Sequence, residues 1–190
     1  MMVLLVALGL FAIFAMFIVL LTTRPKKDHG ALQQVTKFNR EWIPITFVID
    51  EEGLVSTLPR VQFGLRQAIA FWNYGLGFDV FMRLGDIGEG AAVPIIGLEK
   101  TSQALASARL TVGRDGAIKD AFVEIDEGKL YSLKDTEMVR VLCHELGHVL
   151  GLDHDESSSS VMYGRASIAG YRITDKDKEL LTTAYRRTDG

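Results

Sequence analysis

Three of the four histidines of this chain lie in one twelve-residue stretch, CHELGHVLGLDH, at positions 143–154. On an α-helix, residues four apart differ by about 40° around the axis and about 6 Å along it, so His144 and His148 point the same way. A continuing helix would carry His154 to another face. Glycine just after a helix adopts the left-handed conformation that ends it. Gly151 therefore predicts a helix that stops and a chain that brings His154 back towards the first two rings.

Three neutral imidazoles would bind one zinc ion and leave its fourth position open, as in catalytic zinc sites. Glu145 lies three residues before His148, about 60° around the helix axis, so it sits beside such an ion without binding it. This arrangement predicts hydrolysis of peptide bonds by metal-activated water, with Glu145 as general base. Cys143 points about 100° away from His144, which favours a core position over a ligand.

Two other interpretations of the histidines stay open. The chain could be a zinc-bound peptide-binding module that does not turn over. The zinc could also be structural, with Asp155 as its fourth ligand. A weaker alternative for Asp155 is to orient a ligand by a hydrogen bond.

The N-terminus departs from globular composition. Residues 3–21, VLLVALGLFAIFAMFIVLL, carry no charge and as a helix would span about 28 Å, close to the thickness of a bilayer core. The organisation that follows is a transmembrane anchor (or signal sequence) at 1–22, a polar linker at 23–41 and a catalytic domain at 42–190. The missing A-x-A cleavage site and the length of the apolar run favour the anchor. By the positive-inside rule, the three basic residues that follow it would keep the domain in the cytoplasm.

Composition excludes several classes of protein. The formal net charge is −3, and the chain has no Lys/Arg-rich block with interleaved aromatics, so we expect no nucleic-acid partner. The single cysteine excludes an intrachain disulfide.

Hydrophobic patterns predict an α+β domain with a mixed sheet and helices packed on it. The expected strands are 43–50, 78–84, 92–98, 104–112 and 117–126. A first helix begins near Ser56 or Thr57 and ends at Gly75 to Gly77, a second runs from a capping box at Ser132-x-x-Asp135 to about Leu150, and a third follows the box Thr174-x-x-Asp177. The loop 85–90 is read as a turn, with a cation site through Asp86 and Glu89 as the weaker alternative.

The histidine motif and its surroundings resemble a known family. HELGHVLGLDH matches the motif H-E-x-x-H-x-x-G-x-x-H of the metzincin metallopeptidases. The stretch SSVMYG places Met162 eight residues after His154, where that clan has a methionine-bearing turn. The adjacent pair Met162 and Tyr163 looks most like the matrixin branch. The segments IPITFVID, AIAFWN, GAIKDAFVEID and ITDKDKELLTTAY also resemble matrixin elements, so the likeness spans roughly residues 42–187.

The resemblance implies a metzincin-like mixed sheet with an active-site helix, a methionine turn and a C-terminal helix. It implies that a peptide or protein substrate pairs as an added strand with the strand in 105–112. Met162 would be a structural floor of the site, and Tyr163 would be either a pocket wall or ordinary core. The implied cofactor is one catalytic Zn²⁺ ion; calcium also occurs in such enzymes, but no residue pattern here supports it.

The sequence also departs from the family. With no cysteine upstream of the domain, we expect no propeptide thiol latch, and no histidine is left for a second, structural zinc. Gly164 follows Tyr163 where proline is common, so the pocket wall is expected to differ. The family usually lies outside the cytoplasm, against the positive-inside rule, and we expect a single-pass membrane protein with an extracytoplasmic catalytic domain.

Overall fold

The computed structural model describes residues 36–85, 92–98, 104–165 and 170–186. The expected anchor at 1–22, most of the linker and the loop with Asp86 and Glu89 lie outside these residues. Within them, no helix combines the length and the apolar character needed to cross a bilayer.

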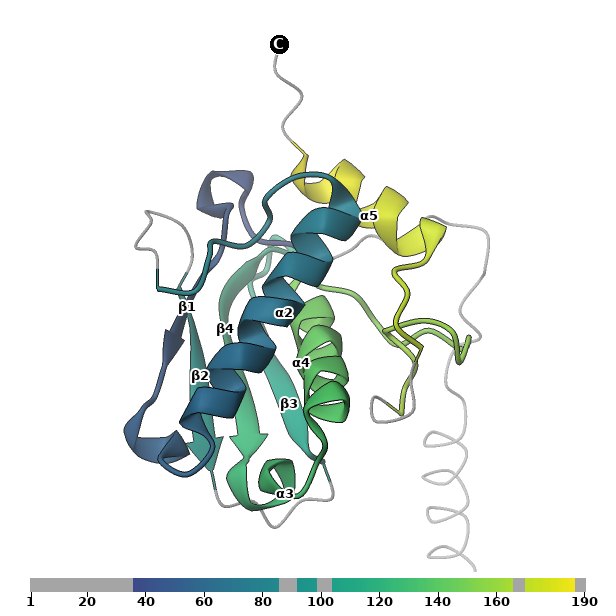
Figure 1. The fold of residues 1–190 in the computed structure, drawn as a ribbon. Helices are drawn as coiled ribbons and strands as arrows, with labels where there is room; N and C mark the ends of the chain where they lie inside the picture. Colours follow the sequence, from purple (N-terminus) through teal and green to yellow (C-terminus); the bar gives the residue numbers. More distant parts are fainter. Residues whose placement is uncertain (1–35, 86–91, 99–103, 166–169, 187–190) are drawn as a thin grey trace, which may run out of the picture. The chain divides into compact units, whose positions relative to one another are not determined.

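A four-stranded mixed sheet forms the frame of the domain (Figure 1). Its strands are β1 (Thr46–Ile49), β2 (Ala92–Leu98), β3 (Ala106–Val112) and β4 (Ile118–Asp126), in the spatial order β1-β2-β4-β3. β2 is parallel to both β1 and β4, whereas β3 is antiparallel to β4. The predicted α+β class with a mixed sheet is therefore confirmed, and β3 is an edge strand.

Helices cover one face of the sheet. Figure 1 shows α2 (Leu58–Leu76) and α4 (Asp135–Val149) side by side in front of it, and α5 (Asp175–Tyr185) closes the chain. The shorter helices are η1 (Arg40–Trp42), η2 (Glu52–Leu54) and α3 (Glu127–Tyr131). α2 and α4 approach closely at Gly64, where an added Cβ would lie 2.6 Å from Cδ1 of Leu142. A side chain at that position would push the two helices apart.

The core lies between the sheet and these helices. Successive strand residues face opposite sides of a sheet, and alternate residues of the strands are buried. Those facing the helices are Phe47, Val93, Ile95, Ala121, Val123 and Ile125, all 7% exposed or less. The helices contribute Val61, Leu65, Trp72, Met138, Leu142 and Leu146, none of which has exposed surface.

The expected strand at 78–84 is wrong as a regular element. Only an isolated bridge joins Phe81 to Ile45. The side chain of Asn73, at the end of α2, accepts from the N–H groups of Val80 and Phe81 at 3.1 and 3.0 Å and donates to the Phe81 carbonyl at 2.8 Å. Because this amide satisfies the main chain there, the segment does not extend a hydrogen-bonded ladder.

Two predicted helix starts are also corrected. Ser132 and Asp135 form no capping box; α4 begins after Lys134, whose N–H donates to Glu137 Oε2 at 2.9 Å. At α2, the side chains of Ser56 and Thr57 do not cap the helix, because their hydroxyls donate to Glu127 Oε1, at 2.8 and 3.2 Å.

The box at Thr174 is confirmed. Its hydroxyl accepts from the N–H of Asp177 and donates to the carboxylate of that residue.

The hydroxyl of Tyr185 ties three segments together. It accepts a hydrogen bond from the N–H of Phe38 at 3.2 Å and donates to the carbonyl of Leu150 at 3.1 Å. Phe38, which falls in the segment 23–41, is itself buried in the core. The N-terminal segment, the end of α4 and the last turn of α5 therefore meet at one phenol.

We expect Tyr185→Phe to lower the free energy of unfolding by about 1–2 kcal/mol, because it leaves a buried N–H and a carbonyl without their shared partner. Urea denaturation measures this change. Tyr74→Phe is the matched control, since Tyr74 is 92% exposed and should change stability by less than about 0.5 kcal/mol. Equal stability of the two variants would contradict the bridging role.

Candidate metal centre

The helix α4 ends at a left-handed glycine, as the sequence predicts. Gly151 has φ 88°, and its N–H donates to the His148 carbonyl at 2.8 Å. The N–H of Leu152 donates to the Gly147 carbonyl at 3.0 Å. This pair of bonds is the Schellman motif, which satisfies the last carbonyls of a helix while reversing the chain.

The reversal also orients two imidazoles. Nδ1 of His148 lies 2.7 Å from the carbonyl oxygen of Leu152, and Nδ1 of His144 lies 2.8 Å from that of Val161. A carbonyl oxygen can only accept, so each Nδ1 carries the proton and donates it. In a neutral ring the other nitrogen, Nε2, then presents a bare lone pair, which is the state of a metal-ligating histidine.

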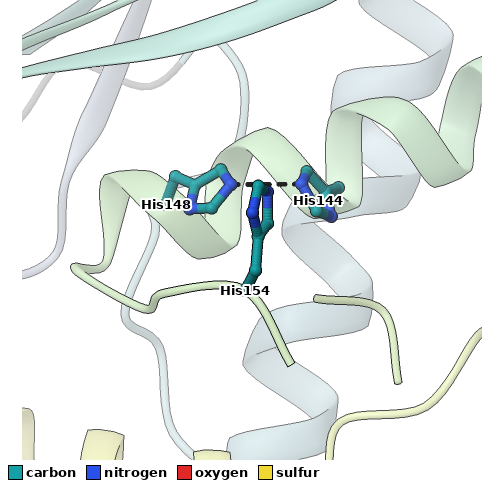
Figure 2. Close-up of side chains that lie close together, drawn as sticks. All are labelled: His144, His148 and His154. Carbon is teal, nitrogen blue, oxygen red and sulfur yellow. Dashed lines mark hydrogen bonds between the residues drawn. The ribbon is translucent and has the colours of Figure 1, made fainter. Parts of the chain in front are cut away.

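The two bare nitrogens face each other. Nε2 of His144 and Nε2 of His148 are 3.1 Å apart, a contact in which neither atom has a proton to donate (Figure 2). Figure 2 shows the ring of His154 turning back from the loop after the helix to lie between them. One nitrogen from each ring lies within 4.8 Å of the others. Two nitrogens bound tetrahedrally to zinc at about 2.0–2.1 Å are about 3.4 Å apart, so this donor set fits that ion.

Burial keeps the rings on the helix neutral. His144 is 3% exposed, and desolvation lowers its pKa to about 4. The same cause lowers the pKa of His148. His154 is exposed, so the centre is open to solvent on its side. A neutral imidazole binds metal without first losing a proton, so burial prepares the site for a cation.

Cys143 lies in the core, as expected. Its thiol is buried and contacts the hydroxyl of Tyr171 at 3.5 Å. Burial raises the pKa of this thiol to about 12, so it stays protonated.

Met162 packs under the helix, as the family resemblance implies. An added Cβ at Gly147 would lie 2.2 Å from Sδ of Met162 and 2.9 Å from the ring of Trp72. Trp72 also donates from Nε1 to the carbonyl of Cys143 at 2.9 Å. Gly147 thus lets a methionine and a tryptophan press against the helix between its two histidines. A glycine inside a helix costs about 1 kcal/mol of stability relative to alanine, so its presence in a predicted helix indicates a close contact at that position.

Glu145 lies on the sheet side of the same helix. Its side chain is 6% exposed, and Oε2 accepts from the N–H of Ala108 in β3 at 2.7 Å. The carboxylate beside the histidines is therefore held against the edge strand of the sheet. Periodicity alone could not reveal this contact, because it joins residues 37 positions apart.

Asp155 bonds within the turn that follows His154. Its carboxylate accepts from the N–H of Ser157 at 2.7 Å, and its N–H donates to the carbonyl of Met162 at 2.8 Å. It belongs to the turn that carries Met162, whereas main-chain carbonyls contact the rings of His144 and His148. Tyr163 is half-buried and forms a bridge with Asp155. Gly164 lies next to His154, with an added Cβ 3.6 Å from Nδ1 of that ring.

We expect Gly151→Ala to cost about 1–2 kcal/mol of stability and to weaken zinc binding at least tenfold, because a Cβ strains the turn that returns Leu152 and His154. Competition with a chromogenic zinc chelator measures the affinity. Gly116→Ala is the control, since Gly116 also has positive φ, 75°, and has no atom near an added Cβ. That variant should lose similar stability and keep its zinc affinity. An equal loss of zinc affinity in both variants would contradict the role of the turn at Gly151.

Comparison with known proteins agrees with this geometry. The family model for the matrixins matches residues 91–186, half of the chain, which include β3, α4, the three histidines and α5. No individual curated protein matches the chain. The family match and the converging histidines together support a zinc metallopeptidase. The chain belongs to the matrixin family.

Proposed function

We propose that this chain is a zinc-dependent endopeptidase in which His144, His148 and His154 hold one catalytic Zn²⁺ and Glu145 is the general base. The observation that carries the proposal is the bond from the N–H of Ala108 to Glu145. It brings together a carboxylate beside the metal ligands and the edge of a sheet that can accept a peptide.

The edge strand β3 supports peptide docking. In a strand, the main-chain groups of successive residues point to opposite sides. The carbonyl of Leu105 accepts from Asp126, towards β4, whereas the N–H of Ala108 donates away from β4 to Glu145. The main-chain groups of Ala106, Ala108 and Leu110 therefore face the open edge. An extended substrate would add there as a strand, so that its scissile bond lies beside Glu145.

The metal and the residues around it have separate roles in this proposal. A zinc held by the three histidines would acidify a water molecule and polarise the substrate carbonyl. Glu145 would take the proton from that water as its oxygen adds to the carbonyl carbon, and would deliver it to the amine nitrogen as the C–N bond breaks. Before a peptide docks, the N–H of Ala108 holds the carboxylate in place, and Met162 packs against the helix at Gly147. Tyr163, half-buried beside the turn, forms part of the pocket wall in this proposal.

We expect Glu145→Ala to retain zinc and to lower peptide hydrolysis by about 10²–10⁴-fold, since it removes the proton carrier and no ligand. Zinc content by atomic emission and cleavage of fluorescein-labelled casein measure the two properties. Glu156→Ala is the control: Glu156 is an exposed carboxylate two residues after His154, and its loss should leave turnover unchanged.

Other outcomes of this experiment favour the alternatives. Unchanged turnover in Glu145→Ala would refute the assignment of the base. A wild-type chain that binds casein and zinc without cleaving would favour the non-catalytic peptide-binding module.

We further propose that residues 3–21 anchor the chain in a membrane by a single pass, with the catalytic domain on the extracytoplasmic side. The length of the uncharged run and the family likeness support this location, while the basic residues after the run oppose it. Added protease should digest the domain on intact cells or right-side-out vesicles; protection there, with digestion only after lysis, would contradict the location.

A further inference from the structure

A second hollow lies between α2 and the segment 78–84, and none of its lining residues belongs to the metal centre. Its volume is about 600 Å³, within the range of protein sites that bind small ligands or short peptides. The floor is apolar: Ile69 of α2 is 4% exposed and Phe81 is 1% exposed. Figure 1 shows the chain after α2 crossing towards the β1 side of the sheet, where this segment lies.

The wall of the hollow is already formed. Asn73 holds the main chain of Val80 and Phe81 by three hydrogen bonds. On its other side, the segment pairs with Ile45, which donates to the Val80 carbonyl at 2.9 Å and accepts from the N–H of Met82 at 2.8 Å. These main-chain groups have no capacity left to pair with a strand, so recognition in the hollow falls to side chains.

The charged side chains that line the hollow indicate the kind of ligand it can bind. Arg66 and Arg83 both line the hollow, together with a single carboxylate, Asp79. Among the described residues, neither guanidinium takes part in an ion pair or hydrogen bond. The chain as a whole carries a net charge of −3, whereas two arginines and one aspartate line this hollow. Guanidinium groups bind carboxylates by paired, charge-assisted hydrogen bonds.

We propose that this hollow is an exosite for an acidic segment of the protein substrate, in which one or two carboxylates meet Arg66 and Arg83 and an apolar neighbour packs on Ile69 and Phe81. Substrate is the partner that a peptidase must meet, so this inference rests on the proposed function. The exosite lies beside β1, at the opposite edge of the sheet from β3. At about 4.8 Å per strand, the three steps from β1 to β3 separate the two edges by about 14 Å. A substrate that fills both sites therefore needs at least about five extended residues between them.

The first test measures binding without catalysis. The probe is a fluorescein-labelled octapeptide with two glutamates and two leucines, titrated with the zinc-loaded full chain in detergent and followed by anisotropy. Arg66→Glu and Arg83→Glu should each weaken binding by about five- to tenfold, because an attractive charge becomes repulsive. Asp79→Asn should tighten binding about twofold, a gain that misfolding cannot produce.

The controls separate the hollow from other charged surfaces. Arg114→Glu changes the same charge at an exposed turn and should leave the affinity unchanged. Binding should persist in the catalytically impaired Glu145→Ala variant and should weaken as salt rises. Equal affinity of a probe in which both glutamates are glutamine, or an unchanged affinity in Arg66→Glu/Arg83→Glu, would overturn the proposal.

The second test connects the exosite to turnover. Two substrates share one cleavage sequence, and one of them carries the acidic segment after a ten-residue Gly/Ser linker. Arg66→Glu/Arg83→Glu should raise KM about tenfold for the extended substrate and leave the short one unchanged. Equal kinetics of the wild type on both substrates would exclude cooperation between the sites. Absence of cleavage of either would count against the proposed function, while the binding test would still decide whether the hollow takes the acidic segment.

Discussion

The metal centre depends on how one helix ends. Leu152 closes the turn at Gly151 with its N–H and orients His148 with its carbonyl, so the same residue fixes both the direction of the chain and a ligand tautomer. Two residues later the chain supplies His154. A turn in which Leu152 moved would therefore lose the ring orientation and the third ligand together. This coupling explains why the glycine is part of the site, although it touches no metal.

The helix that carries the ligands is held from several sides. Trp72 bonds the carbonyl of Cys143, Met162 packs against Gly147, and Tyr185 bonds the carbonyl of Leu150 just after the last turn. These contacts come from α2, the turn after His154 and α5. Two ligands thus rest on a rigid element in the core, which limits the reorganisation needed when a cation binds. The third histidine, His154, is exposed, so the centre is accessible from its side.

The sequence predicted the features that depend on local spacing and periodicity. It did not predict the contacts made by residues that lie far away in the chain. Spacing alone predicted the convergence of the histidines, because helix geometry and one glycine determine it. The interactions that corrected other predictions are long-range or made by side chains. Glu127, 70 positions away, binds the hydroxyl of Thr57 that was predicted to cap α2, and Asn73 occupies the main chain of the segment predicted as a strand. The contact between the carbonyl of Val161 and His144 involves a main-chain group, so residue types cannot predict it.

The two edges of the sheet follow different rules of recognition. Beside β1, the pairing of Ile45 with residues 80–82 and the amide of Asn73 use up the main-chain groups, so a ligand can be read only by side-chain charge and shape. Along β3 the main-chain groups of alternate residues face outwards, so that edge offers a strand template. An exposed edge also invites unwanted pairing between chains. Here Glu145 occupies one donor of the edge, so the residue proposed as the base also reduces that exposure. A peptide that docks on β3 competes for the same N–H, which couples substrate entry to the position of the carboxylate that would act on it.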